Sequence, residues 1–308
     1  MMVEADGLGR RFGEVAAVEG LTFAAARGEL FGIVGPDGAG KTTTLRMLAG
    51  VLRPTAGSAR VDGVDVAREP ERVKDRIAYM AQRFGLYADL TVRENLEFYA
   101  DLYQVPRPAR AARIARLHEF SGLGPFEGRL AGQLSGGMQQ KLSLSCALVH
   151  EPPVLLLDEP TFGVDPISRR DLWLILHEVV GRGVTVVVST AYLDEAERCD
   201  RVVLLHRGRA AALDRPAALQ ARLAGKILAV SSHHPRPAEQ FLRRHPAVRR
   251  AALFGHTIHV TLRPGLGWES VAPGLAAEGI QVAGVEPVAP SLEDVFLDLM
   301  ADAETPGD

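Results

Sequence analysis

Cysteine and long apolar runs are both scarce in this chain. Cys146 and Cys199 are the only cysteines among 308 residues, so no disulfide framework is expected, and the count suits a reducing compartment. The longest apolar runs, 154–157 and 184–188, have the length of a β-strand, whereas a membrane-crossing helix needs about 18 apolar residues. The first residues lack the apolar core of a signal peptide. If the protein acts at a membrane, we therefore expect another chain to supply the membrane-spanning part.

An excess of charge of either sign is missing as well. Lys and Arg number 35 against 38 Asp and Glu, which gives a net charge of −3. This balance gives no reason to expect nucleic acid as a partner. The hydrophobic fraction of 47% is typical of a folded protein and excludes a disordered chain, and the length indicates roughly two domains.

Residues 1–225 alternate apolar runs with helical patterns. That alternation predicts an α/β fold with a mostly parallel sheet that helices cover on both faces. The apolar runs lie at 29–35, 154–159, 184–190 and 202–209, and the helical patterns lie at 41–52 and 168–183.

Residues 91–150 instead have helical patterns and no strand pattern. Thr91 and Glu94 form a capping box that begins the first helix. Further helices are expected at 108–122 and after 134–137, so a helical insertion interrupts the core. The apolar side chains expected on one face of the first helix are Val92, Leu96, Tyr99, Leu102 and Tyr103.

The pattern changes again after about residue 225. Strand and helix signals follow in the order βαββαβ, and Ile258, Val260 and Leu262 alternate as in a half-exposed strand. Ser291 and Asp294 then predict the start of a final helix. We therefore expect a small C-terminal α+β domain over 226–308, after a first domain over 1–225.

A glycine-rich loop joins the first buried strand to the helix after it. Its sequence fits GxxxxGK[ST], a pattern whose backbone N–H groups surround a chain of phosphates. Lys41 adds a cation beside the β- and γ-phosphates, and Thr42 offers a hydroxyl to Mg²⁺. A chance match to an ordinary turn is expected in roughly one chain of this size in a hundred. The predicted phosphate contacts are Gly35, Pro36, Asp37, Gly38, Ala39, Gly40, Lys41, Thr42 and Thr43.

Two further sequences carry chemistry. The strand at 154–157 ends in Asp158, placed to join the shell of Mg²⁺, and Glu159, placed to act as a general base on water. Such a pair by itself often caps the next helix, but the phosphate loop favours the chemical roles. The sequence Leu134-Ser135-Gly136-Gly137-Met138 opens a helix and offers a second anion site. Standing alone, it would be a simple helix cap.

The phosphate loop, LSGGM and LLLDEPT, in this order and at this spacing, resemble the ATP-binding subunits of ABC transporters over residues 1–220. The resemblance implies a P-loop ABC ATPase core with ATP and Mg²⁺ as cofactors. It implies that two subunits pair head to tail, with each ATP between the phosphate loop of one chain and Ser135, Gly136 and Gly137 of the other. Residues 163–166 match the loop that crosses this interface.

The resemblance also adds residue roles. Phe12 matches an aromatic that stacks on adenine, and this interpretation is favoured over an ordinary core position because position as well as residue type agrees. Gln82 matches a glutamine that touches Mg²⁺ and joins the core to the helical insertion. The implied catalytic residues are Glu159, Gln82 and Lys41, and the implied metal ligands are Thr42, Gln82 and Asp158.

The whole chain is similar to the YbhF-type ATPases of bacterial multidrug exporters, as in GPDGAGKTT, STAYLDEAERCDRV and PSLEDVFLDLM. This implies an ATPase on the cytoplasmic face of the inner membrane. Its implied partners are a separate integral-membrane permease and a second ATP-binding subunit, in a homodimer or a heterodimer. Two alternatives stay open: a soluble ABC ATPase outside transport, and a regulatory subunit with little turnover.

One residue departs from the family pattern. The family has a histidine after the strand that here reads VTVVVST, where it contacts the γ-phosphate and orients water, but this chain has Ala191. A methyl group does neither. The loss of one such contact typically lowers the rate about 10²–10³-fold, by analogy with an oxyanion-hole donor. The sequence therefore supports ATP binding more strongly than rapid hydrolysis at this chain's own site.

Overall fold

The computed structural model describes residues 1–82 and 85–304. The chain divides into two compact units, Met1–Asp214 and Arg215–Asp308. The boundary lies before the one expected after residue 225, because helix α8 (Pro216–Ala221) packs against helix α11 (Leu292–Glu304) in the second unit. No helix of the described residues is long and apolar enough to cross a membrane.

The main sheet of the first unit has the strand order β10-β9-β3-β8-β7-β6. Its strands pair in parallel except β10, which is antiparallel to β9. The expected strand at 202–209 is in fact a hairpin, because Arg207 and Gly208 both have a positive φ and form its two-residue turn. The strands are β3 (Leu30–Val34), β6 (Ile77–Met80), β7 (Val154–Asp158), β8 (Thr185–Thr190), β9 (Arg201–His206) and β10 (Arg209–Asp214).

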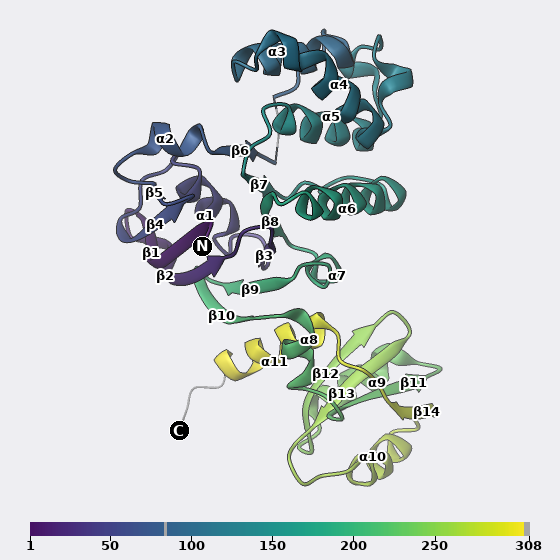
Figure 1. Ribbon diagram of the computed structural model, residues 1–308. Helices are drawn as coiled ribbons and strands as arrows, with labels where there is room; N and C mark the ends of the chain where they lie inside the picture. Colours follow the sequence, from purple (N-terminus) through teal and green to yellow (C-terminus); the bar gives the residue numbers. More distant parts are fainter. Residues whose placement is uncertain (83–84, 305–308) are drawn as a thin grey trace. The chain divides into compact units, whose positions relative to one another are not determined.

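An antiparallel sheet of order β2-β1-β4-β5 packs near the main sheet (Figure 1) and has no counterpart in the sequence analysis. Helix α1 (Lys41–Leu48) packs with both sheets, since its buried Leu45, Met47 and Leu48 share one core cluster with side chains of each. The helix expected at 41–52 begins at Lys41 but already ends at Leu48. The strands are β1 (Val3–Phe12), β2 (Val15–Ala25), β4 (Ala56–Val61) and β5 (Val64–Asp65).

The helical insertion lies beyond strand β6 in Figure 1. The capping box is confirmed, because the backbone N–H of Glu94 donates to Thr91 Oγ1 and that of Thr91 donates to Glu94 Oε2. The prediction that Leu102 lies on the buried apolar face is wrong. Leu102 is the last residue of α3, at the edge of that face, and is 58% exposed. The helices of the first unit after α1 are α2 (Pro70–Lys74), α3 (Val92–Leu102), α4 (Arg107–Ser121), α5 (Gly136–Leu148), α6 (Pro166–Gly181) and α7 (Leu193–Ala196), with 3₁₀ turns η1 (Gly124–Phe126) and η2 (Ala131–Gln133).

The second unit has the expected βαββαβ order and an antiparallel sheet, β12-β13-β11-β14. Ile258 and Val260 of β13 pack with Leu242 and Leu275 of the helices. The predicted start of α11 is confirmed, because the N–H of Asp294 donates to Ser291 Oγ. The remaining elements are β11 (Ile227–Ser232), α9 (Pro235–Arg244), β12 (Val248–Phe254), β13 (Thr257–Leu262), η3 (Trp268–Ser270), α10 (Ala272–Ala277) and β14 (Val282–Pro287).

Candidate functional site

The glycine-rich loop connects β3 to α1 and is packed tightly against neighbouring backbone. Gly40 has a φ of 104°, and a Cβ there would lie 2.5 Å from the carbonyl oxygen of Ala17. A Cβ on Gly35 would lie 2.3 Å from the carbonyl oxygen of Leu205. Only glycine fits at both places, so the loop is held in one conformation. The N-terminus of α1 follows directly after it.

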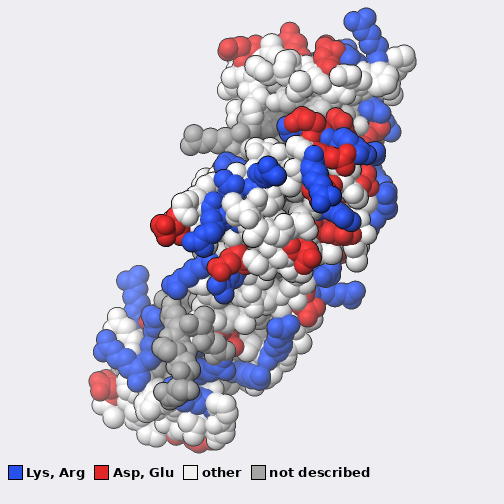
Figure 2. All heavy atoms as spheres, turned by 90° about the vertical axis from the view of Figure 1, so that its left-hand side faces the viewer, with Lys and Arg blue, Asp and Glu red and all other residues white. Residues whose placement is uncertain are grey.

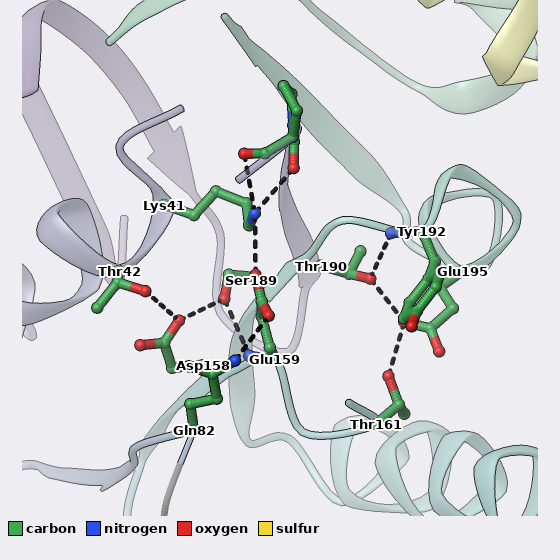
Figure 3. A network of polar contacts seen from close by, with 12 residues as sticks. Lys41, Thr42, Gln82, Asp158, Glu159, Thr161, Ser189, Thr190, Tyr192 and Glu195 are labelled. Atoms are coloured by element: carbon green, nitrogen blue, oxygen red, sulfur yellow. Dashed lines mark hydrogen bonds and ion pairs between the residues drawn. The ribbon is translucent and has the colours of Figure 1, made fainter. Parts of the chain in front are cut away.

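Lys41, 4% exposed, extends back across this loop (Figure 3). Its Nζ donates to the carbonyl oxygens of Gly35 at 2.8 Å and Pro36 at 3.2 Å, and lies 2.9 Å from Glu159 Oε1. The cation is thus held at the centre of the loop. It is fixed there by two carbonyl dipoles and one carboxylate rather than by solvent.

Asp158, 1% exposed, ends strand β7 and accepts hydrogen bonds on both oxygens. Oδ1 accepts from Thr42 Oγ1 at 3.0 Å and Ser189 Oγ at 2.8 Å, and Oδ2 accepts from Tyr79 OH at 3.4 Å. Burial, together with the charge of Asp158, raises the pKa of Tyr79 to about 12, so the phenol stays a donor. The Thr42 hydroxyl and the Asp158 carboxylate are hard oxygen donors side by side, which fits Mg²⁺.

Glu159 follows with a φ of 49°, a left-handed conformation that non-glycine residues rarely adopt. Its backbone N–H donates to Ser189 Oγ at 3.0 Å and to the Ser189 carbonyl oxygen at 3.2 Å. Its Oε2 accepts from Gln82 Nε2 at 3.1 Å. The side chain is therefore turned toward Lys41 and Gln82, on the loop side of the strand (Figure 3).

A cavity of about 460 Å³ lies beside Lys41, Thr42, Gln82 and Glu159. The cavity unites the phosphate loop from Asp37 onward, Glu159 and Gln82, which the sequence analysis assigned to one site. Ala17 and Phe162 also line it and were not expected. The lining residues are Ala17, Asp37, Gly38, Ala39, Gly40, Lys41, Thr42, Thr43, Gln82, Glu159 and Phe162.

Three groups of expected site residues lie outside this lining. The first is Gly35, Pro36 and Asp158, which instead contact the lining residues Lys41 and Thr42. Phe12 is 48% exposed with the Arg10 guanidinium 4.7 Å from its ring centroid, so the interpretation as a core residue is wrong. Ser135, Gly136 and Gly137 begin α5, where Ser135 Oγ accepts from the N–H of Met138. Within the described part of the chain, they do not line the cavity beside the phosphate loop.

Ala191 comes directly after β8, at the edge of the sheet that carries the site. Thr190, the residue before it, pairs with Val34 of β3, and its carbonyl oxygen accepts from the N–H of Gly35 at 3.3 Å. Ala191 therefore lies level with the start of the phosphate loop. Ser189, which bonds to both carboxylate residues, was missed; a polar residue at the carboxyl end of a buried strand was its signal.

Comparison with known proteins gives the family. Residues 18–162 match the ABC transporter family. The chain is 35% identical to the daunorubicin resistance ATP-binding protein DrrA2 of Streptomyces coeruleorubidus, over 96% of this chain and 94% of that protein. The chain belongs to the ATP-binding proteins of ABC transporters. It is also 37% identical to the Nod factor export ATP-binding protein I of Paraburkholderia xenovorans, over 83% of this chain and 84% of that one.

Two more relatives of this ABC ATP-binding protein define its extent and its fold. It is 44% identical to the probable multidrug ABC transporter ATP-binding protein YbhF of Escherichia coli over 99% of its own length, but spans about half, 53%, of that relative. A solved ATP-binding subunit of an ABC transporter covers 72% of the chain with a TM-score of 0.66, 30% identity and 93% of its own length covered. The expected P-loop ABC fold is thereby confirmed.

Proposed function

We propose that this chain binds and hydrolyses ATP and thereby powers an exporter through a separate membrane permease. The observation that carries the proposal is the pair of Lys41 and Glu159, set between a phosphate loop and Asp158. The relatives support the export role, because their names specify probable multidrug transport, daunorubicin resistance and Nod factor export. Multidrug efflux is the substrate class that we propose.

ATP binding begins with a change of partner at Lys41. A phosphate chain on the loop brings several anionic oxygens to Lys41 Nζ, which Glu159 Oε1 contacts at 2.9 Å. Transfer of the cation to phosphate leaves the Glu159 carboxylate free to accept a proton from a water molecule. Gln82, bonded to the other oxygen of Glu159, orients this carboxylate and connects it to the segment that leads into the helical insertion.

Thr42 and Asp158 are the residues that would hold Mg²⁺, with Gln82 close by. The bound ion would neutralise charge on the β- and γ-phosphates. Asp158 is held in place for this contact, because Ser189 donates to the oxygen that also accepts from Thr42, and Tyr79 donates to the other oxygen. Such positioning of a ligand by neighbouring donors typically contributes strongly to metal affinity.

We propose that a second ATP-binding subunit completes the site. Ser135 and Gly136 are exposed at the start of α5, and they lie outside the cavity of their own chain. A helix start with exposed N–H groups suits phosphate from another chain. A solved cassette, dimeric and bound to ADP and phosphate, is 26% identical with a TM-score of 0.63, covers 70% of this chain and is itself 98% covered.

The proposed location is the cytoplasmic face of the inner membrane, on a permease. The soluble alternative is less favoured, because the names of the relatives specify export. On the face shown in Figure 2, Lys and Arg also interleave with Asp and Glu. The regulatory alternative depends on Ala191. In a homodimer both sites would lack the histidine, whereas in a heterodimer Ser135, Gly136 and Gly137 would serve a competent partner site.

Purification of the chain with its membrane partners tests the proposal directly. We expect a multi-span permease in the complex, and ATPase activity that Lys41→Ala abolishes. Lys74→Ala is the matched control, because Lys74 is an exposed lysine whose contact is with Glu71 on its own helix. A complex without a membrane protein would contradict the export role. Unchanged nucleotide affinity and turnover in Lys41→Ala would contradict the site.

A further inference from the structure

Glu195 is a buried carboxylate that the proposed mechanism does not use. It lies on α7 and is 1% exposed. Its Oε2 accepts from Thr190 Oγ1 at 2.7 Å and from Thr161 Oγ1 at 2.9 Å, and its Oε1 lies 3.3 Å from Arg169 Nε. Figure 3 shows the two threonines converging on it, Thr190 from the end of β8 and Thr161 from the turn after β7.

The groups that meet at Glu195 adjoin the catalytic carboxylates on two sides. Thr190 follows Ser189, whose hydroxyl donates to Asp158 and accepts from the N–H of Glu159. Thr161 lies two residues after Glu159 on the other side. Glu195 therefore links the end of β8, where Ser189 binds the backbone of Glu159, to the turn that follows Glu159.

Glu195 also holds both ends of residues 162–168, a segment that runs from the turn after β7 into the first turn of α6. Thr161 precedes residues 162–168 and Arg169 follows them, and both contact the same carboxylate. Within this segment, Phe162 in the turn is 57% exposed and Ile167 in the first turn of α6 is 76% exposed. The segment thus carries two large apolar side chains on the surface while its two ends are fixed at one buried carboxylate.

The backbone between Asp158 and Thr161 is strained at Glu159. The left-handed φ of Glu159 costs free energy, and such conformations persist only where the surroundings over-determine them. A buried carboxylate is costly unless it is paired and hydrogen-bonded. Glu195 therefore favours the arrangement in which Thr161, Thr190 and Arg169 all contact its carboxylate. The Arg169 guanidinium, 4.3 Å from the ring centroid of Tyr192, closes the cluster around the segment that contains Ala191.

We infer that Glu195 is a positioning residue: it fixes the Glu159 carboxylate for hydrolysis and couples nucleotide binding to the segment at 162–168, the turn after β7 and the first turn of α6. The inference rests on the proposed ATPase activity. It assigns no contact between Glu195 and ATP, because Glu195 acts through Thr161 and Thr190. Loss of the Glu195 carboxylate should therefore lower turnover and change the local opening of the segment at 162–168, but leave nucleotide affinity intact.

Glu195→Gln tests the positioning role. The amide keeps the size but replaces one acceptor oxygen and removes the charge opposite Arg169. We expect kcat to fall by at least about tenfold, with KM and ATP affinity within about twofold of the wild type. Asp194→Asn is the control, since Asp194 is an exposed carboxylate on the same helix and should leave both constants unchanged. Arg169→Lys keeps the cation and should retain most of kcat, whereas Arg169→Gln should not.

A second measurement does not depend on turnover. Arg169 and Arg170 lie near the start of α6, and trypsin cleaves after them when the start of the helix opens locally. We therefore expect ATP to change the cleavage rate there in the wild type and not in Glu195→Gln. Wild-type kcat in Glu195→Gln would overturn the positioning role, as would a parallel loss of ATP affinity and melting temperature. Cleavage without any ATP dependence in the wild type would overturn the coupling. ATP-dependent cleavage in a chain that does not hydrolyse ATP would contradict the proposed ATPase activity alone.

Discussion

Lys41 Nζ and Glu159 Oε1 form an ion pair of 2.9 Å in which the side chains are 4% and 11% exposed. A buried pair is stable only when its geometry is good and its other donors and acceptors are satisfied. Here the Gly35 carbonyl and the Gln82 amide supply those bonds. The cation for phosphate and the proposed base are therefore held by one another, and a change in one alters the other.

Glu159→Gln should stop turnover while ATP binding persists. The amide keeps the shape but is not a base, so we expect hydrolysis to fall by about 10²–10⁴-fold. ATP should bind at least as tightly as in the wild type, because Lys41 loses an anionic competitor for the phosphates. Steady-state ATPase and equilibrium nucleotide binding measure the two effects, with the exposed Glu119→Gln as control. Weaker ATP binding in Glu159→Gln would mean that the carboxylate holds Lys41 in place for ATP.

Ala191→His should raise the ATPase rate of the isolated chain. The residue lies level with the start of the phosphate loop, so an imidazole there is placed to donate to phosphate. A gain of about tenfold corresponds to about 1.4 kcal/mol of transition-state stabilisation. Ala191→Phe, a ring without a donor, is the control and should give no gain. A wild type that turns over at about 1 s⁻¹ without any improvement from histidine would show that Ala191 is no handicap.

A chain that ends at Asp214 should keep its ATP affinity. Every residue that lines the cavity belongs to the first unit. A chain that ends at residue 225 should bind ATP equally well but aggregate more readily, because it retains Leu219 of α8, which is fully buried in the whole chain. Nucleotide binding and light scattering on the two truncations decide this. Loss of binding in a folded 1–214 chain would show that the C-terminal unit completes the site.

Asp294→Asn should destabilise the C-terminal unit. Asp294 is fully buried and accepts from Arg250 Nη2 at 3.1 Å, with His259 Nδ1 at 3.0 Å. Its removal leaves the buried Arg250 uncompensated, which typically costs roughly 3 kcal/mol or more. Thermal unfolding of the full chain at neutral pH measures the loss. Glu293→Gln, an exposed carboxylate in the same turn, should change little.

The loss of stability in Asp294→Asn should depend on pH. Burial acts to raise the pKa of Asp294, but hydrogen bonds from Ser291 and His259 outweigh it and hold the pKa below its usual value. The contribution of the carboxylate to stability is therefore complete above about pH 3.9, the pKa of a free aspartate, and is lost as the pH falls through the lower folded pKa. The stability difference between wild type and Asp294→Asn should shrink in acid. A constant difference would assign the effect to packing alone.

Local signals predicted the parts of the fold that depend on near neighbours. The phosphate loop, the capping box of Thr91 and the cap of α11 each lie within a few residues, so their chemistry can be read in order along the chain. The sheet β2-β1-β4-β5 gave no such signal. Register shifts between Ala5 and Leu8 and between Leu8 and Arg10 break the alternation of apolar and polar residues that marks a strand.

The sequence by itself determined the family, the loop for phosphate and the presence of Asp158 and Glu159 after a buried strand. The tertiary structure decided which distant groups meet these carboxylates. Ser189 contacts Asp158 because β7 and β8 pair in parallel at that register. Lys41 contacts Glu159 because β3 and β7 end at the same edge of the sheet. Pairing of strands far apart in sequence is set by packing of the whole sheet, so no local pattern encodes it.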